Sequence, residues 1–600
     1  MFDSTKLMST SDDFVVLRES NSYFVDKTML IKEAVENCWD SNVLTRPKGF
    51  GKTTFLTMMR AFLDVDVNNP GSTEKQQKLF AGTKILEDKE FCQKFMGQYP
   101  CIYLPLKDVK GRTYEEAYEK FANTIYESAK KFAYLLDSPK LRESDKREFK
   151  RYLDPDYLMD IDNAIGVERY VRVLSRLLNI HFERSVFHFI DDYEIPIFEG
   201  KNHCYLNQIS YLIGRLLWCL RDENSSIRQS YVCATNSVGN EIMSSQLSHS
   251  DRCNVEDWRL STDFCFGFTP TDLDELLESF CLSKHKDFIV ENFGGYELTD
   301  GTSISPFDVV NFVNDRLKKK KLPKNLLENK YVCDLLKDDL ACKCVKSLIK
   351  INTSAIQNLV DGSKVTFEIV RYWDTECYKL DDDDSCLTIL LHKGWLTKLP
   401  LELKLKEKSD NGINLYSNSL TTVKIPNEKM LVIFEKLAEI SFNENFLPFN
   451  EADKIANALL NGDDNYVQTE LRARLKSFIS LKPKDSNYQA VSYYHEFMET
   501  VFNCCSKMSV QDNVPTYEVG EGYIIIIFKD LEGERATVIN LVASEDQNKS
   551  RIDLADKAIA QIEEEHYVES LIEDENITSI YLYGMAFYRK ACSVRVKQVM

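Results

Sequence analysis

The first third of the chain alternates between short apolar runs and longer stretches with helical spacing. The apolar runs are rich in β-branched and aromatic residues, as buried strands are. The stretch TTFLTMMRAFL at residues 53–63 instead repeats its apolar positions every three or four residues, which predicts a helix. An alternation of strands and helices favours an α/β domain with a central parallel sheet. Strands are expected at residues 42–45, 99–106, 186–190, 229–236 and 263–269.

The loop between the first expected strand and this helix has the composition of a phosphate-binding loop. Its sequence, RPKGFGKT, matches the end of the P-loop pattern G-x-x-x-x-G-K-[ST], in which backbone N–H groups hold phosphates and the lysine reaches their outer oxygens. A GKT triplet alone also occurs by chance. The strand before it and the helix after it favour a nucleotide, because a helix N-terminus attracts anions. The predicted nucleotide-binding residues in the loop are Arg46, Pro47, Lys48, Gly49, Phe50, Gly51, Lys52, Thr53 and Thr54.

Two acidic residues follow the apolar run at residues 186–190. A nucleotide site needs a carboxylate that holds Mg²⁺ at the end of a neighbouring buried strand. We predict that Asp191 and Thr53 are the metal ligands, and that Asp192 polarises the attacking water. Asp192 and Lys52 are therefore the predicted catalytic residues. The alternative for the acidic pair is a strand that ends in a solvated turn.

The fourth expected strand ends in Thr235 and Asn236. These polar groups either sense the γ-phosphate or cap the next helix, and the sequence does not distinguish the two roles. We include Asn236 among the predicted nucleotide-binding residues.

The composition is that of an ordinary globular protein, and together with the sequence patterns it indicates where in the cell the protein is expected. Six hundred residues, 44% hydrophobic and 28% charged, are expected to form two to four domains. The sequence shows neither a signal peptide nor an apolar run of the roughly 20 residues that span a bilayer. Its 17 cysteines lack the CxxC spacing of zinc sites. We therefore expect an intracellular protein, cytoplasmic or nuclear, that does not associate with membranes.

The order of the motifs resembles that of AAA-ATPase-like proteins with a C-terminal PD-(D/E)XK nuclease-like module. That family has an arginine where other P-loops have their first glycine, as Arg46 stands here. The resemblance implies binding of ATP and Mg²⁺. It also implies a P-loop domain at residues 10–310, a mostly helical linking region at 311–470 and a small α/β module at 471–600. The motifs are YFVDKT (23–28), RPKGFGKT (46–53), IDDYEIP (190–196), FGFT (266–269), FGGY…SPFD (293–308), GWLT (394–397) and KIPNEKM (424–430).

Two departures from the family pattern concern hydrolysis. The family's Asp-Glu-Tyr-Asp is here Asp191, Asp192, Tyr193 and Glu194, so the catalytic-type carboxylate at 192 loses about an ångström of reach. The family also tends to have Thr-Gly and a nearby arginine after its fourth strand, where this chain has Asn236 and Gly239. An arginine from a neighbouring subunit could replace the missing charge. ATP binding with slow hydrolysis is therefore the expected activity.

The C-terminal module is expected to lack nuclease chemistry. A PD-(D/E)XK site needs an aspartate on one strand and Glu-x-Lys on the next, to hold Mg²⁺ and to orient the attacking water. The resemblance aligns GEGYIIIIF and TVINLVA with these strands, which puts Ile525, Asn540 and Val542 at the site positions. Isoleucine and valine cannot bind a hard cation, and a neutral amide is a poor replacement for a carboxylate.

Three functions follow from these observations. The preferred one is an ATP-binding protein whose nucleotide state is coupled to an inactive nuclease-like module that binds a partner. The alternatives are an ATP-gated nuclease and an interaction scaffold that has lost both activities. A homo-oligomer or a protein client would be the partner. Nucleic acid is a weaker expectation, because a net charge of −19 repels a phosphate backbone.

Overall fold

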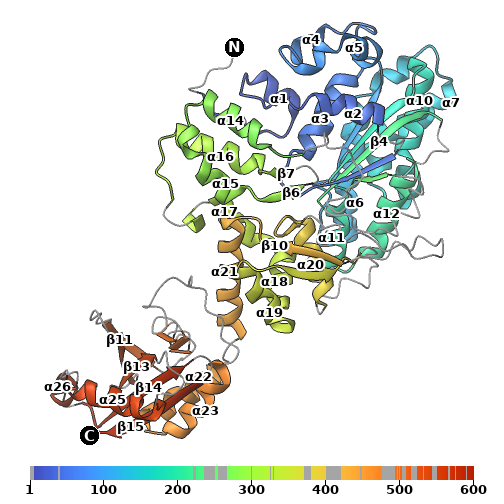
Figure 1. Ribbon diagram of the computed structural model, residues 1–600. Helices are drawn as coiled ribbons and strands as arrows, with labels where there is room; N and C mark the ends of the chain where they lie inside the picture. Colours follow the sequence, from blue (N-terminus) through green and yellow to red (C-terminus); the bar gives the residue numbers. More distant parts are fainter. Residues whose placement is uncertain are drawn as a thin grey trace, which may run out of the picture. The chain divides into compact units, whose positions relative to one another are not determined.

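The computed structural model divides into two compact units, Met1–Ile433 and Phe434–Met600 (Figure 1). The three predicted segments with boundaries at 311 and 471 stay a prediction. No helix within the described residues is both long enough and apolar enough to cross a membrane. The structure describes residues 6–37, 41–220, 225–235, 251–253, 266–298, 301–323, 326–328, 330–370, 380, 382–399, 420–445, 449–475, 494–495, 497–498, 501–502, 508–514, 523–530, 533–543, 550–564, 568–574, 576–588 and 591–600.

A parallel sheet with the strand order β2-β3-β4-β1-β5 forms the centre of the N-terminal unit. It confirms the predicted α/β class, and its first four strands lie where the apolar runs predicted them. The predicted fifth strand is wrong for residues 266–269, where Phe268 forms an isolated bridge with Ile304. Residues 263–265 lie outside the described part. The strands are β1 (Ser41–Thr45), β2 (Cys101–Pro105), β3 (Val186–Asp191), β4 (Ile227–Ala234) and β5 (Asp251–Cys253).

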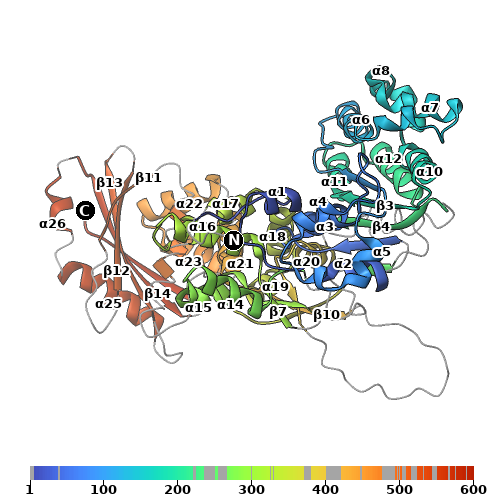
Figure 2. The ribbon, with the colours of Figure 1, turned by 90° about the horizontal axis from the view of Figure 1, so that it is seen from above.

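Helices cover both faces of this sheet (Figure 2). The strands alternate accordingly: in β3, Phe187 and Phe189 join one core, and Val186 and Ile190 join the other. The first core includes α2 (Met29–Asn37), α3 (Lys52–Leu63) and α5 (Lys89–Phe95), and the second includes α6 (Tyr114–Lys130), α10 (Tyr170–Phe182) and α12 (Leu206–Trp218). The other helices up to β4 are α1 (Phe14–Glu19), α4 (Glu74–Leu79), α7 (Glu143–Lys150), α8 (Pro155–Met159), α9 (Ala164–Val167) and α11 (Glu194–Asn202).

The rest of this unit combines helices with two small antiparallel sheets. One sheet pairs β6 (Tyr296–Leu298) with β7 (Gly301–Ser303). The other has the order β8-β10-β9 and contains β8 (Val365–Glu368), β9 (Thr397–Lys398) and β10 (Leu420–Lys424). The helices are α14 (Pro270–Ser279), α15 (Lys286–Phe293), α16 (Pro306–Leu317), α17 (Lys330–Cys333), α18 (Asp339–Ile351), α19 (Thr353–Val360), α20 (Asp383–His392) and α21 (Glu428–Asn445), which includes the division between the units.

The C-terminal unit has a mixed sheet with the order β11-β12-β13-β14-β15. Its strands pair antiparallel except β13 and β14, which run parallel and are joined through α25. Residues of α25 pack on one face of the sheet, and residues of α22 and α23 pack on the other. The elements are α22 (Phe449–Leu460), α23 (Asp464–Leu475), β11 (Met508–Val514), β12 (Tyr523–Asp530), β13 (Arg535–Ala543), α25 (Arg551–Glu564), α26 (Glu569–Ile572), β14 (Ser579–Tyr588) and β15 (Ala591–Gln598).

Candidate functional site

The loop between β1 and α3 has the backbone shape that its glycines permit. Gly49 and Gly51 have φ angles of +87° and +89°, in the left-handed region that favours glycine. Gly51 precedes the first residue of α3, and no heavy atom lies within 4 Å of where its Cβ would be. The sequence therefore forms an open turn directly at a helix N-terminus.

Lys52 is held inside this loop. Its side chain is 7% exposed, and its Nζ donates hydrogen bonds to the carbonyl oxygens of Arg46 at 2.7 Å and Pro47 at 3.2 Å. The side chain of Arg46 is directed elsewhere. It donates to the Thr45 carbonyl at 2.8 Å and lies over the Phe266 ring at 5.6 Å. Arg46 thus supports the loop, while the Lys52 ammonium lies at its centre.

Asp191 ends β3 beside the first turn of α3. Thr53 interacts with its carboxylate, and the Tyr103 hydroxyl donates to its Oδ2 at 3.3 Å. Its Oδ1 is buried and has no hydrogen-bond partner within the described residues. Burial, together with the neighbouring Asp192, raises the pKa of Asp191, and Thr53 and Lys52 oppose this shift. The structure thus brings the two predicted metal ligands together.

Asp192 follows in an uncommon backbone conformation with a φ of +55°. It is half-buried, and burial raises its pKa, whereas Lys52 and Lys107 lower it. Lys107 lies just beyond β2, the neighbour of β3, and was not among the predicted site residues. Its position after an expected strand was the signal that could have identified it.

Glu194 is a second residue that the sequence analysis did not place in the site. It begins α11, is 1% exposed, and its Oε1 accepts the backbone N–H of Thr235 at 2.6 Å. Burial, and then the charge of Asp192, raises the pKa of Glu194 to about 7. Its position in the IDDYEIP motif was visible in the sequence, but its contact with the end of β4 was not. Asn236 and Gly239 lie outside the described residues.

Motifs from distant parts of the chain surround the phosphate loop. The Phe50 ring meets the Tyr296 ring edge-on at 4.9 Å, and the N–H of Phe307 donates to the Gly49 carbonyl at 3.3 Å. Gly394 of the GWLT motif lies against Pro47, so close that a Cβ there would be 2.5 Å from the Pro47 Cβ. Tyr296, Phe307 and Gly394 thus form part of a wall around the loop.

We expect that Gly394→Ala destabilises the protein more than Gly362→Ala. Both glycines have a positive φ, +74° and +76°, so both substitutions carry the same backbone strain. Gly362 has open space at its Cβ position, whereas the Gly394 variant must displace Pro47. Overpacking costs about 1–3 kcal/mol, and the difference between the melting temperatures of the two variants measures it. Equal melting temperatures would show that Pro47 can move away from an added Cβ at residue 394 without a cost in stability.

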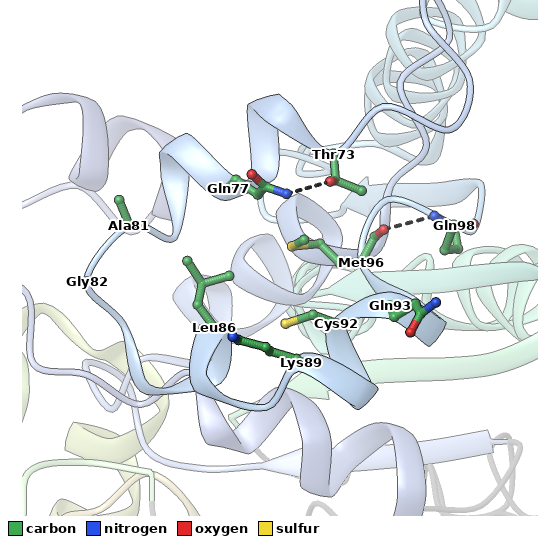
Figure 3. A pocket seen from close by; sticks show the side chains of 10 residues that line it. All are labelled: Thr73, Gln77, Ala81, Gly82, Leu86, Lys89, Cys92, Gln93, Met96 and Gln98. Atoms are coloured by element: carbon green, nitrogen blue, oxygen red, sulfur yellow. Dashed lines mark hydrogen bonds between the residues drawn. The ribbon is translucent and has the colours of Figure 1, made fainter.

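A separate hollow of about 730 Å³ lies at the surface beside α4 and α5 (Figure 3). It contains none of the predicted site residues. Its lining mixes amide and apolar side chains: Thr73, Gln77, Ala81, Gly82, Leu86, Lys89, Cys92, Gln93, Met96 and Gln98. We therefore place the candidate site at the phosphate loop and not in this hollow.

Residues 10–234 match the family model described as Predicted AAA-ATPase. This part of the chain is therefore similar to that family. The match includes the phosphate loop, Asp191 and Asp192, and the strands β1 to β4. No curated protein matches the chain.

In the C-terminal unit, the three positions expected for the site residues of a nuclease carry side chains that are unsuited to metal binding or catalysis. Ile525 on β12 pairs directly with Asn540 on β13, and both are buried. The amide of Asn540 donates to the Ala558 carbonyl and to Gln561, both at 3.1 Å. Val542 packs against the same apolar cluster as Ile525. Within the described residues, no three or more acidic, histidine or cysteine side chains form a group that could hold a metal ion.

Proposed function

We propose that the N-terminal unit binds ATP with Mg²⁺ and hydrolyses it slowly. The observation that carries this proposal is the meeting of Lys52, Thr53 and Asp191 at the carboxyl edge of the parallel sheet, where open α/β sheets bind their ligands. The match of residues 10–234 to a predicted AAA-ATPase family supports the same conclusion.

The residues present fit a nucleotide and a metal ion. The open space beside Gly51 and the N-terminus of α3 suit an anionic phosphate. The Lys52 ammonium would exchange two loop carbonyls for phosphate oxygens. The partnerless Oδ1 of Asp191, with the Thr53 hydroxyl beside that carboxylate, is an oxygen donor set that suits Mg²⁺. Bound Mg²⁺ would neutralise charge on the phosphates.

The other residues of the site would act on the attacking water. Asp192 is the general base that we propose, because it follows the metal-binding strand and lies in the electrostatic field of Lys52. Its short side chain is our reason to expect slow turnover. Asn236 is proposed to contact the γ-phosphate. A neighbouring subunit would supply the arginine that the family tends to have where this chain has Asn236 and Gly239.

For the C-terminal unit we propose a catalytically inactive PD-(D/E)XK-like module that binds a partner. The positions of Ile525 and Asn540 as register partners on β12 and β13, with no carboxylate at either position, support the loss of nuclease chemistry. A protein client or a second copy of the chain is the proposed partner, and the nucleotide state of the N-terminal unit would regulate that contact. The net charge of −19 disfavours nucleic acid.

Metal dependence tests the nucleotide site. The dissociation constant of ATP, measured by calorimetry on the full chain, is expected to be at least tenfold lower with Mg²⁺ than with EDTA. Asp191→Asn should remove most of this difference, because a neutral amide is a weak Mg²⁺ ligand. Asp64→Asn is the matched control, since Asp64 accepts the N–H of Cys101 at the opposite end of β2. A chain that binds no ATP under either condition would refute the proposed function.

A further inference from the structure

Glu194 connects the ends of two neighbouring strands. It lies three residues beyond the end of β3, and its Oε1 accepts the N–H of Thr235, the residue after β4, at 2.6 Å. A hydrogen bond this short from a backbone N–H to a carboxylate is of the strong, charge-assisted type. The side chain is 1% exposed, and its Oε2 has no hydrogen-bond partner within the described residues. A carboxylate that is buried in this way is costly to desolvate, and its hydrogen bonds to the backbone of Thr235 and of Glu194 itself offset only part of that cost.

The strand that Glu194 holds is central to the candidate site. In the sheet, β4 lies between β1, which leads into the phosphate loop, and β3, which ends at Asp191. The end of β4 is fixed on its other side as well, because the N–H of Arg46 donates to the Ala234 carbonyl at 3.3 Å. Lys52 and Asp192 both act electrostatically on Glu194, so the carboxylate lies close to the groups that are proposed to act on ATP.

We propose that Glu194 is a positioning residue for ATP hydrolysis. Its carboxylate fixes Thr235, the residue after β4, against the turn that carries Asp192. This inference rests on the proposed function, and it concerns the hydrolytic step and not the binding of ATP. Glu194 touches neither phosphate nor water in this role. It holds the ends of β3 and β4 at a fixed distance from each other while the attacking water is activated.

The length of the side chain is the critical property. An aspartate at 194 keeps the charge but cannot span the distance to Thr235, so the two strand ends would separate or shift. A displacement of about 1 Å away from the reacting atoms is enough to lower a rate about 10²-fold. A glutamine keeps both the length and an oxygen acceptor for the Thr235 N–H.

The test is steady-state ATP hydrolysis by the full chain, with kcat, KM and the dissociation constant of ATP measured for each variant. Glu194→Asp should lower kcat about 10²-fold and leave KM and the dissociation constant within threefold. Glu194→Gln should retain kcat within about fivefold. Glu168→Asp is the matched control, because Glu168 is 2% exposed and paired with Arg215 in the same unit. It is expected to lower the melting temperature without changing kcat more than twofold.

Several outcomes would overturn the inference. A Glu194→Asp variant with the parental kcat would contradict the inference. A variant whose kcat, ATP affinity and melting temperature all fall together would also contradict it, because that is the effect of a residue that only stabilises the fold. If the parent protein binds ATP without hydrolysing it, the inference about Glu194 fails, whereas the proposed binding of ATP stands. A parent that binds no ATP would refute the proposed function itself.

Discussion

Lys52→Ala is expected to weaken ATP binding by at least about 10²-fold. The Lys52 ammonium is nine-tenths buried at the centre of the loop, at the N-terminus of α3. Hydrogen bonds to charged groups contribute about 1.5–3 kcal/mol each, and the Lys52 ammonium is the group that is proposed to make them to the phosphates. Alanine also leaves the carbonyl oxygens of Arg46 and Pro47 without this donor, so the loop itself would relax.

Calorimetric titration of the full chain with ATP and Mg²⁺ would measure this loss. Lys32→Ala is the matched control, since it removes a lysine whose partner is Asp88 and leaves the loop unchanged. Circular dichroism would verify that both variants fold. ATP affinity that survives in Lys52→Ala would mean that the loop does not cradle phosphate, and the assignment of the site would fail.

Asp192→Asn is expected to lower ATP turnover by about 10²-fold or more while affinity for ATP changes less than threefold. General-base catalysis contributes about 10²- to 10⁴-fold, and an asparagine of the same shape cannot accept the proton. Removal of a negative charge beside Lys52 cannot weaken the attraction of the site for an anionic phosphate.

Turnover and binding must be measured separately for this variant. The expected pattern is a loss confined to kcat, with the dissociation constant of ATP determined by titration on the same sample. Equal turnover in the parent and the variant would show that Asp192 is not the general base. A parallel loss of affinity would instead indicate that Asp192 shapes the phosphate site.

The local signals of the sequence were sufficient for the individual parts of the candidate site. An apolar run, a glycine-containing turn and helical spacing predicted β1, the loop and α3, because these elements depend mainly on neighbouring residues. The same holds for the buried strand before Asp191. The fifth strand was mispredicted because residues 266–269 include Gly267, with a φ of +99°, and Thr269, which caps α14.

Only the tertiary structure decided which of these parts meet. The order β2-β3-β4-β1-β5 puts β4 between the phosphate loop and Asp191, and periodicity along one strand carries no information about its neighbours. The contact of Glu194 with Thr235 and the packing of Gly394 against Pro47 depend on that arrangement. The pairing of Ile525 with Asn540 likewise follows from strand register. The sequence alone therefore predicted most chemical groups of the candidate site, because they follow local motifs. Long-range packing determined the distances between them and added Lys107 and Glu194.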